Sequence, residues 1–231
     1  MTAVDDAPTS GAGVSRVALV IGATGLVGRE LVRQLLDDPD YDSVRTFVRR
    51  PSGVMHERLD ERVVSFDDVQ ALAPALAGEV LFSALGTTRR TAGSARAQFA
   101  IDHDLNLAIA EAAALRGVPA YVLVSAAGAS PSSPIFYSRM KGQLERAVAR
   151  LAFESIRILK PGLLDGERSE SRPGEGLARG LLRALPAWSA LSAVRPVPAA
   201  VVARAMRTVA ADWSPGVQVL LPAQIALLGQ E

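Results

Sequence analysis

The 231-residue chain contains no cysteine, only two histidines and only two lysines, Lys141 and Lys160. The absence of cysteine excludes disulfides, thiolate nucleophiles and cysteine metal sites. His56 has no ligand spacing around it, and His103 is flanked by acids that cannot all face one metal ion from a helix. We therefore expect no metal site. The net charge of +1 gives no sign of a nucleic-acid partner.

Segments typical of secretion or of membrane insertion are also lacking. Residues 1–15 are small and polar, with two acids and no basic residue, whereas a signal peptide needs a basic start and an apolar segment. The longest uncharged stretch, 117–138, is interrupted by glycine, proline and serine. We expect residues 1–15 to be a disordered tail and the protein to have no membrane partner. A cytoplasmic location fits the lack of cysteine.

Over the rest of the chain, short apolar runs alternate with helical patterns. The predicted strands are 17–21, 44–48, 63–66, 80–85, 120–125, 155–159 and 217–221, and the predicted helices are 26–36, 69–76, 96–116, 138–151, 176–185 and 199–211. This order predicts an α/β fold, a Rossmann-like doubly wound parallel sheet with helices on both faces. The composition changes after Pro161, so we expect one domain over 16–231 in which 163–231 contributes a small C-terminal cap.

A glycine-spaced turn follows the first predicted strand and leads directly into a helix. Strand, glycine turn and helix form the context that holds a dinucleotide pyrophosphate. Gly22 would permit the tight turn, Gly25 the approach of the backbone to the phosphates, and Gly28 close packing of helix on strand. The free N–H groups of the helix would face the anion. The turn residues predicted to contact the cofactor are Gly22, Thr24, Gly25, Leu26, Val27 and Gly28.

The residues after the second predicted strand bear on the choice of dinucleotide. An NAD site usually has an acid there for the ribose 2′-hydroxyl. This chain has Arg49 and Arg50 instead, and guanidinium groups suit a 2′-phosphate. We therefore expect NADP, with NAD as the less favoured cofactor. The alternative is a solvated arginine pair before a turn.

Tyr137 and Lys141 lie four residues apart, and on a helix they share one face. A free tyrosine has a pKa of about 10, and a nearby ammonium lowers it toward the range useful in acid–base catalysis. Ser125, at the end of the preceding strand, could hold a substrate oxygen. We predict Ser125, Tyr137 and Lys141 to be catalytic, with Tyr137 and Lys141 also contacting the cofactor. The alternative is a buried tyrosine and a surface lysine on an ordinary helix.

These motifs resemble the short-chain dehydrogenase/reductase superfamily over about 16–228. The shared features are the glycine turn, a serine before Tyr-x-x-x-Lys, and Lys160-Pro161-Gly162. Finer features look like its atypical branch of HIV Tat-interacting oxidoreductase-like proteins: Leu85-Gly86-Thr87 after the fourth strand, the arginine pair, and Glu-Ser-Arg-Pro-Gly-Glu at 170–175. The resemblance implies further cofactor contacts at Leu85, Gly86, Thr87, Pro161, Gly162 and Leu163. One departure is Asp102, where these enzymes often carry an asparagine that holds a proton-relay water.

Two functions remain open from the sequence. The first is an NADP(H)-dependent oxidoreductase that acts on a small carbonyl or alcohol, with Tyr137 as the acid–base. The second is an NADPH-binding regulatory or redox-sensing protein without turnover, which acts through protein partners. The sequence does not identify the substrate, and it is compatible with either a monomer or a homodimer.

Overall fold

The computed structural model describes residues 16–165, 196–212 and 214–230. Its main sheet contains seven parallel strands in the order β3-β2-β1-β4-β5-β6-β9. The strands are β1 (Val17–Ile21), β2 (Ser43–Val48), β3 (Leu59–Val63), β4 (Val80–Ser83), β5 (Ala120–Val124), β6 (Ser155–Leu159) and β9 (Gly216–Leu220). The predicted doubly wound parallel sheet is confirmed.

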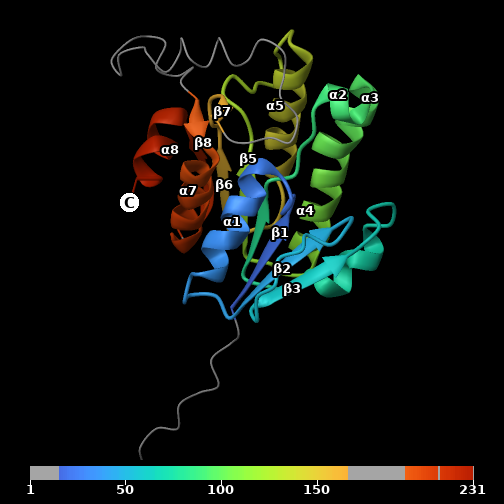
Figure 1. Ribbon diagram of the computed structural model, residues 1–231. Helices are drawn as coiled ribbons and strands as arrows, with labels where there is room; N and C mark the ends of the chain where they lie inside the picture. Colours follow the sequence, from blue (N-terminus) through green and yellow to red (C-terminus); the bar gives the residue numbers. More distant parts are fainter. Residues whose placement is uncertain (1–15, 166–195, 213, 231) are drawn as a thin grey trace, which may run out of the picture.

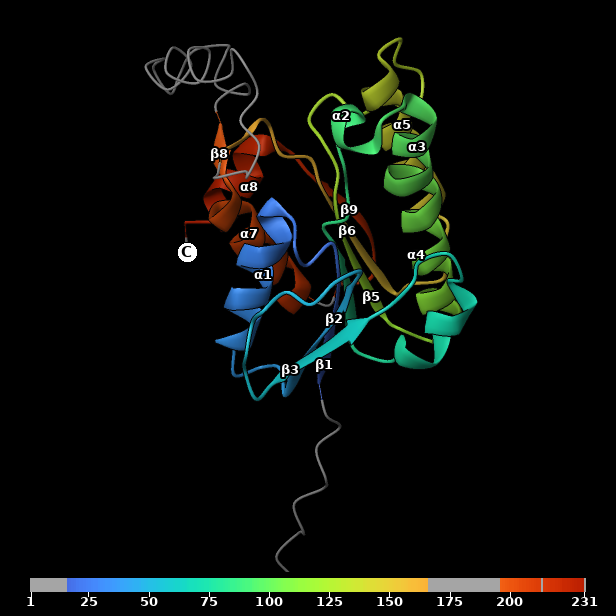
Figure 2. The same ribbon diagram turned by 45° about the vertical axis from the view of Figure 1, so that its right-hand side comes forward.

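Helices cover both faces of this sheet, as Figures 1 and 2 show. One face carries α1 (Leu26–Leu36), α7 (Ala199–Ala211) and α8 (Pro222–Leu228), and the other carries η1 (Gln70–Ala75), α4 (Asn106–Leu115) and α5 (Phe136–Val148). Ala18 and Val20 of β1 pack in the first core, and Leu19 and Ile21 pack in the second. A strand buried on both faces is apolar throughout, which explains the continuous run at 17–21.

Several predicted elements differ from the structure only at their ends, such as α5, which covers Phe136–Val148 where 138–151 was predicted, and three differ more. The strand predicted at 63–66 is wrong, because β3 runs from Leu59 to Val63 at the edge of the sheet. An ion pair joins this polar strand to β2: the Nε of Arg45 lies 2.6 Å from Oδ2 of Asp60. The helix predicted at 69–76 is instead the 3-10 helix η1, which contains Pro74. Proline lacks the N–H that an α-helix interior needs.

The helix predicted at 96–116 is divided into three parts: α3 (Ala95–Phe99), the π-helical segment η2 (Ala100–Leu105) and α4. The Asn106 side chain donates hydrogen bonds to the carbonyls of Ile101 and Asp102, at 3.4 and 3.2 Å, where the helix widens. A short helix that was not predicted, α2 (Arg89–Ala92), precedes it.

Part of the segment expected to form a cap belongs to the main layers. Strand β9 is the seventh strand of the sheet and α7 packs against α1, while β7 (Leu164–Asp165) pairs with β8 (Val197–Pro198). The predicted tail over 1–15, the helix at 176–185 and the motif at 170–175 lie outside the described residues. A cap function for the remainder of 163–231 stays a prediction.

Candidate functional site

The parallel strands all end at one edge of the sheet, and the predicted site residues lie in the segments that leave this edge. At its centre, β1 separates β2 from β4, which is the topological switch point of the sheet. Ligands of open α/β sheets bind outside the carboxyl ends of the strands at such a point. The glycine turn, the arginine pair and the segment Leu85-Gly86-Thr87 follow these three strands.

The glycine turn has a geometry that only glycine permits. Gly22 has a φ of +77°, and a Cβ atom placed there would lie 2.4 Å from the carbonyl carbon of Ala84. A Cβ atom on Gly28 would lie 2.0 Å from the carbonyl oxygen of Gly22. The turn therefore brings its backbone directly against the end of β4, and α1 directly against the turn.

The first turn of α1 is open toward this edge. Gly25 is the N-cap residue and provides no side-chain hydrogen bond to the helix N–H groups. Thr24 and Gly25 are exposed, whereas Val27 and Gly28 are buried. Uncapped N–H groups and the positive end of the helix dipole suit a phosphate group. The turn thus fits the pyrophosphate of a dinucleotide.

Arg49 and Arg50 follow β2 directly, and both are exposed. Ile21 of β1 pairs with Phe47 of β2, so the arginine pair lies beside the glycine turn. On the other side of the site, Pro161 is buried, Gly162 is partly buried and Leu163 is exposed. The Ala127 N–H donates to the Pro161 carbonyl at 2.8 Å, which joins the segments after β5 and β6.

Lys141 is buried, with 4% of its surface exposed. Its Nζ donates to the Val124 carbonyl at 3.4 Å, next to Ser125. Burial lowers the pKa of Lys141, and the carboxylates of Asp102 and Glu145 oppose that change. Tyr137, one helical turn earlier on α5, is 40% exposed. The predicted triad thus combines a buried amine with a phenol at the surface.

Ser125 has a partner that the sequence analysis missed. Its Oγ donates to the Glu145 carboxylate, and the second oxygen of Glu145 lies 3.0 Å from the Nζ of Lys160. Lys160 also donates to the Ala129 carbonyl at 2.7 Å. Glu145 lies one turn after Lys141 and two turns after Tyr137. That repeated spacing of four residues is the signal that could have identified it.

Asp102 supports the segment after β4. It is 1% exposed, and one carboxylate oxygen accepts the Thr87 backbone N–H at 2.6 Å. Burial raises the pKa of Asp102, while Lys141, the Thr87 N–H and Gln98 act in the opposite direction. Asn106, also missed, is fully buried and donates to the Leu85 carbonyl at 3.2 Å. Both side chains therefore fix the backbone of residues predicted to contact the cofactor.

Within the described ranges, no group of three or more histidine or acidic side chains is arranged to hold a metal ion. In the same ranges, no helix has the length and apolar character that crossing a membrane requires.

Comparison with known proteins identifies relatives across most of the chain. The profile of a family described as NAD(P)H-binding matches residues 22–160. Protein fmp52, mitochondrial, from Emericella nidulans is 42% identical over 176 residues, which cover 72% of this chain and 74% of that protein. Protein FMP52, mitochondrial, from Saccharomyces cerevisiae is 42% identical over 157 residues, which cover 67% of this chain and 68% of that protein.

Solved structures show the same fold. A UDP-N-acetylglucosamine 4-epimerase from Methanobrevibacter ruminantium has a TM-score of 0.66 at 15% identity, with 90% of this chain and 76% of that chain covered. A short-chain dehydrogenase/reductase superfamily protein from Agrobacterium tumefaciens with bound NAD has a TM-score of 0.54 at 25% identity, with 65% and 50% covered.

Two predictions are corrected by these comparisons. The cytoplasmic location is contradicted, because both relatives are named mitochondrial. The relatives carry the name FMP52 and do not point specifically to the Tat-interacting branch. The predicted Rossmann-like fold is confirmed by the shared fold, and the profile match shows the NAD(P)H-binding family. The chain belongs to the NAD(P)H-binding family, and its Rossmann-like fold matches the solved structures of the epimerase and of the short-chain dehydrogenase/reductase superfamily protein.

Proposed function

We propose that the protein is an NADP(H)-dependent oxidoreductase that interconverts a small carbonyl compound and its alcohol. The observation that carries this proposal is the burial of Lys141 one helical turn after Tyr137, beside the end of β5. Burying an amine costs free energy, and such perturbed groups concentrate at functional sites. Two carboxylates face Lys141 and favour its charged form.

The glycine turn and the open end of α1 would hold the pyrophosphate, and Arg49 and Arg50 would hold the 2′-phosphate of NADP. When bound, NADPH supplies the hydride for the carbonyl carbon. Tyr137 gives its proton to the substrate oxygen, and the Lys141 ammonium favours the resulting phenolate. Ser125 orients the substrate oxygen once its hydroxyl turns away from Glu145.

The alternative is an NADPH-binding regulatory protein. The hydrogen bond from Ser125 to Glu145 favours it, because the hydroxyl hydrogen is directed away from any substrate. Binding measured by calorimetry, combined with NADPH oxidation over a panel of small carbonyl compounds, separates the two functions. Binding without turnover on any compound would support the regulatory protein.

The Tyr137→Phe variant tests the mechanism. We expect it to bind NADPH like the unaltered protein and to lose turnover by about 100-fold or more. Tyr41→Phe is the matched control, since Tyr41 precedes β2 at the opposite edge of the sheet. Full turnover in Tyr137→Phe would show that the phenol is not the acid–base.

A further inference from the structure

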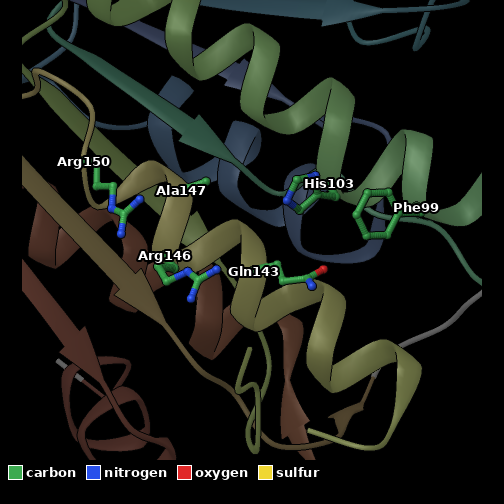
Figure 3. Close-up of a pocket in the computed structure, with 6 residues that line it drawn as sticks. All are labelled: Phe99, His103, Gln143, Arg146, Ala147 and Arg150. Atoms are coloured by element: carbon green, nitrogen blue, oxygen red, sulfur yellow. The ribbon is translucent and has the colours of Figure 1, made fainter. Parts of the chain in front are cut away.

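Helix α5 carries a second polar face besides the one that bears Tyr137, Lys141 and Glu145. Gln143, Arg146, Ala147 and Arg150 follow one another at intervals of three, one and three residues. This spacing places Gln143, Arg146 and Ala147 along one side of the helix, and Arg150 lies in the turn that follows its last residue, Val148. They face the helical run that contains η2, on the side away from the sheet (Figure 3).

The opposite wall comes from two rings four residues apart. Phe99 and His103 are stacked, with ring centroids 4.5 Å apart and an angle of 24° between the planes. Only 15% of the His103 side chain is exposed, and its Nδ1 lies 2.9 Å from an oxygen of Asp104. Stacking and this contact hold the imidazole in place, with Nε2 as the remaining ring nitrogen.

These six residues line an open hollow of about 380 Å³, which Figure 3 shows between the two helices. Sites for small molecules commonly have volumes of about 300–1,000 Å³. The side chains that line the hollow offer hydrogen-bond donors: two guanidinium groups, an imidazole and an amide. It lies on a different face of α5 from the site described above.

No ion pair joins Arg146 or Arg150 to a carboxylate in the described part of the chain. Asp104 contacts His103, and Glu145 is directed to Ser125 and Lys160. Two guanidinium groups one turn apart match the charge of a phosphate dianion better than that of a single carboxylate.

We propose that the hollow between η2 and α5 binds the phosphate group of a small soluble molecule, held by Arg146 and Arg150 with His103 on the opposite wall. This site is separate from the dinucleotide site, and the inference does not depend on the proposed oxidoreductase activity.

The two histidines of the chain provide a direct readout. His103 lines the hollow, whereas His56 is exposed in the connection before β3 and its Nδ1 accepts the Arg58 N–H. Inorganic phosphate, titrated at constant pH and ionic strength into histidine-labelled protein saturated with NADPH, should shift the His103 imidazole resonances in a saturable way. The His56 resonances should not shift. Equal shifts of both histidines, or no saturation for His103, would overturn the proposal.

Variants connect the shift to the arginines. Arg146→Gln and Arg150→Gln should each weaken phosphate binding about tenfold, because each removes a charge-assisted contact. The matched control, Arg116→Gln, makes the same charge change at the end of α4 beyond the hollow and should bind phosphate normally. Unchanged affinity in both hollow variants would count against the site, and so would equal weakening in Arg116→Gln.

Two further measurements address other occupants. Vesicles of phosphatidylcholine with added phosphatidic acid test a lipid headgroup as the source of the phosphate. Binding to such vesicles without binding of free phosphate would contradict the proposal. Sedimentation of the unaltered protein and of Arg150→Gln tests a second copy of the chain. A change in oligomeric state without any phosphate-dependent shift at His103 would also contradict it.

Discussion

The two sides of the candidate site are built in different ways. The side that would hold the phosphates is made of backbone: the glycine turn after β1 and the uncapped start of α1. The side that carries Lys141 is made of side chains that reach between β5, α5 and β6. Local glycine spacing specifies the first side, whereas the second depends on pairs of residues far apart in the sequence. Substitutions on the backbone side should therefore act through steric collisions, and substitutions on the side-chain side should act through lost charge interactions.

The largest effect is expected on the backbone side. Gly22→Ala should lower the free energy of unfolding by about 4 kcal/mol or more, because it adds a collision with Ala84 to the strain of a positive φ. Gly117→Ala is the matched control, since Gly117 has a φ of +78° and open space around it. That variant should lose only about 1–2 kcal/mol. Urea unfolding measures both, and equal losses would show that the close approach contributes nothing.

On the side-chain side, Glu145→Gln should lower the free energy of unfolding by about 2–3 kcal/mol. The substitution removes the carboxylate that pairs with the Lys160 ammonium, and water cannot easily replace it because both side chains are only 14% exposed. Glu30→Gln removes an exposed ion pair with Arg33 and should cost less than about 0.5 kcal/mol. The same unfolding assay compares the two variants. If they lost the same amount, the Glu145 bridge would be no stronger than a surface pair.

Arg49 and Arg50 lie beside the backbone side of the site and supply charged side chains there. Replacing both Arg49 and Arg50 with glutamine should weaken NADPH binding about 10–100-fold and leave NADH binding within about twofold. Calorimetry with both cofactors checks this, with Arg116→Gln as the control. If the affinities for NADPH and NADH fell by the same factor, the arginine pair would not contact the 2′-phosphate.

The smallest effect concerns pH and belongs to the side-chain side. Burial lowers the pKa of Lys141 below its ordinary value of 10.5, so the folded protein releases this proton at a lower pH than the unfolded chain does. Between those two values the unfolded chain holds more protons, and folding becomes more favourable as the pH rises. The gain is at most about 1.4 kcal/mol per pH unit.

The free energy of unfolding is measured from neutral pH to pH ~10 for the unaltered protein and for Lys141→Met. Subtracting the two values at each pH isolates the contribution of Lys141, because the other titrating groups are present in both proteins. The difference in unfolding free energy should move in favour of the unaltered protein as the pH rises. A difference independent of pH would indicate that Lys141 titrates as it does in the unfolded chain.

The sequence by itself determined the alternation of strands and helices, the parallel sheet and the glycine turn. These follow from local patterns: apolar runs buried on both faces, and glycines where a side chain has no room. The bounds of α1, α7 and β6 agree with the prediction for the same reason. Ser125, Tyr137 and Lys141 were recognised as residue types at a known spacing, but not by their environment.

Only the tertiary structure decided that environment. The approach of Asp102 to the buried Lys141, the bond from Ser125 to Glu145 and the support of Thr87 by Asp102 join residues that lie 15 to 39 positions apart. The π-helical segment η2 and the incorporation of β9 into the main sheet likewise depend on contacts across the fold. Sequence patterns specify which face of an element is apolar. Packing decides which polar groups meet at the sheet edge and so what charge each one carries.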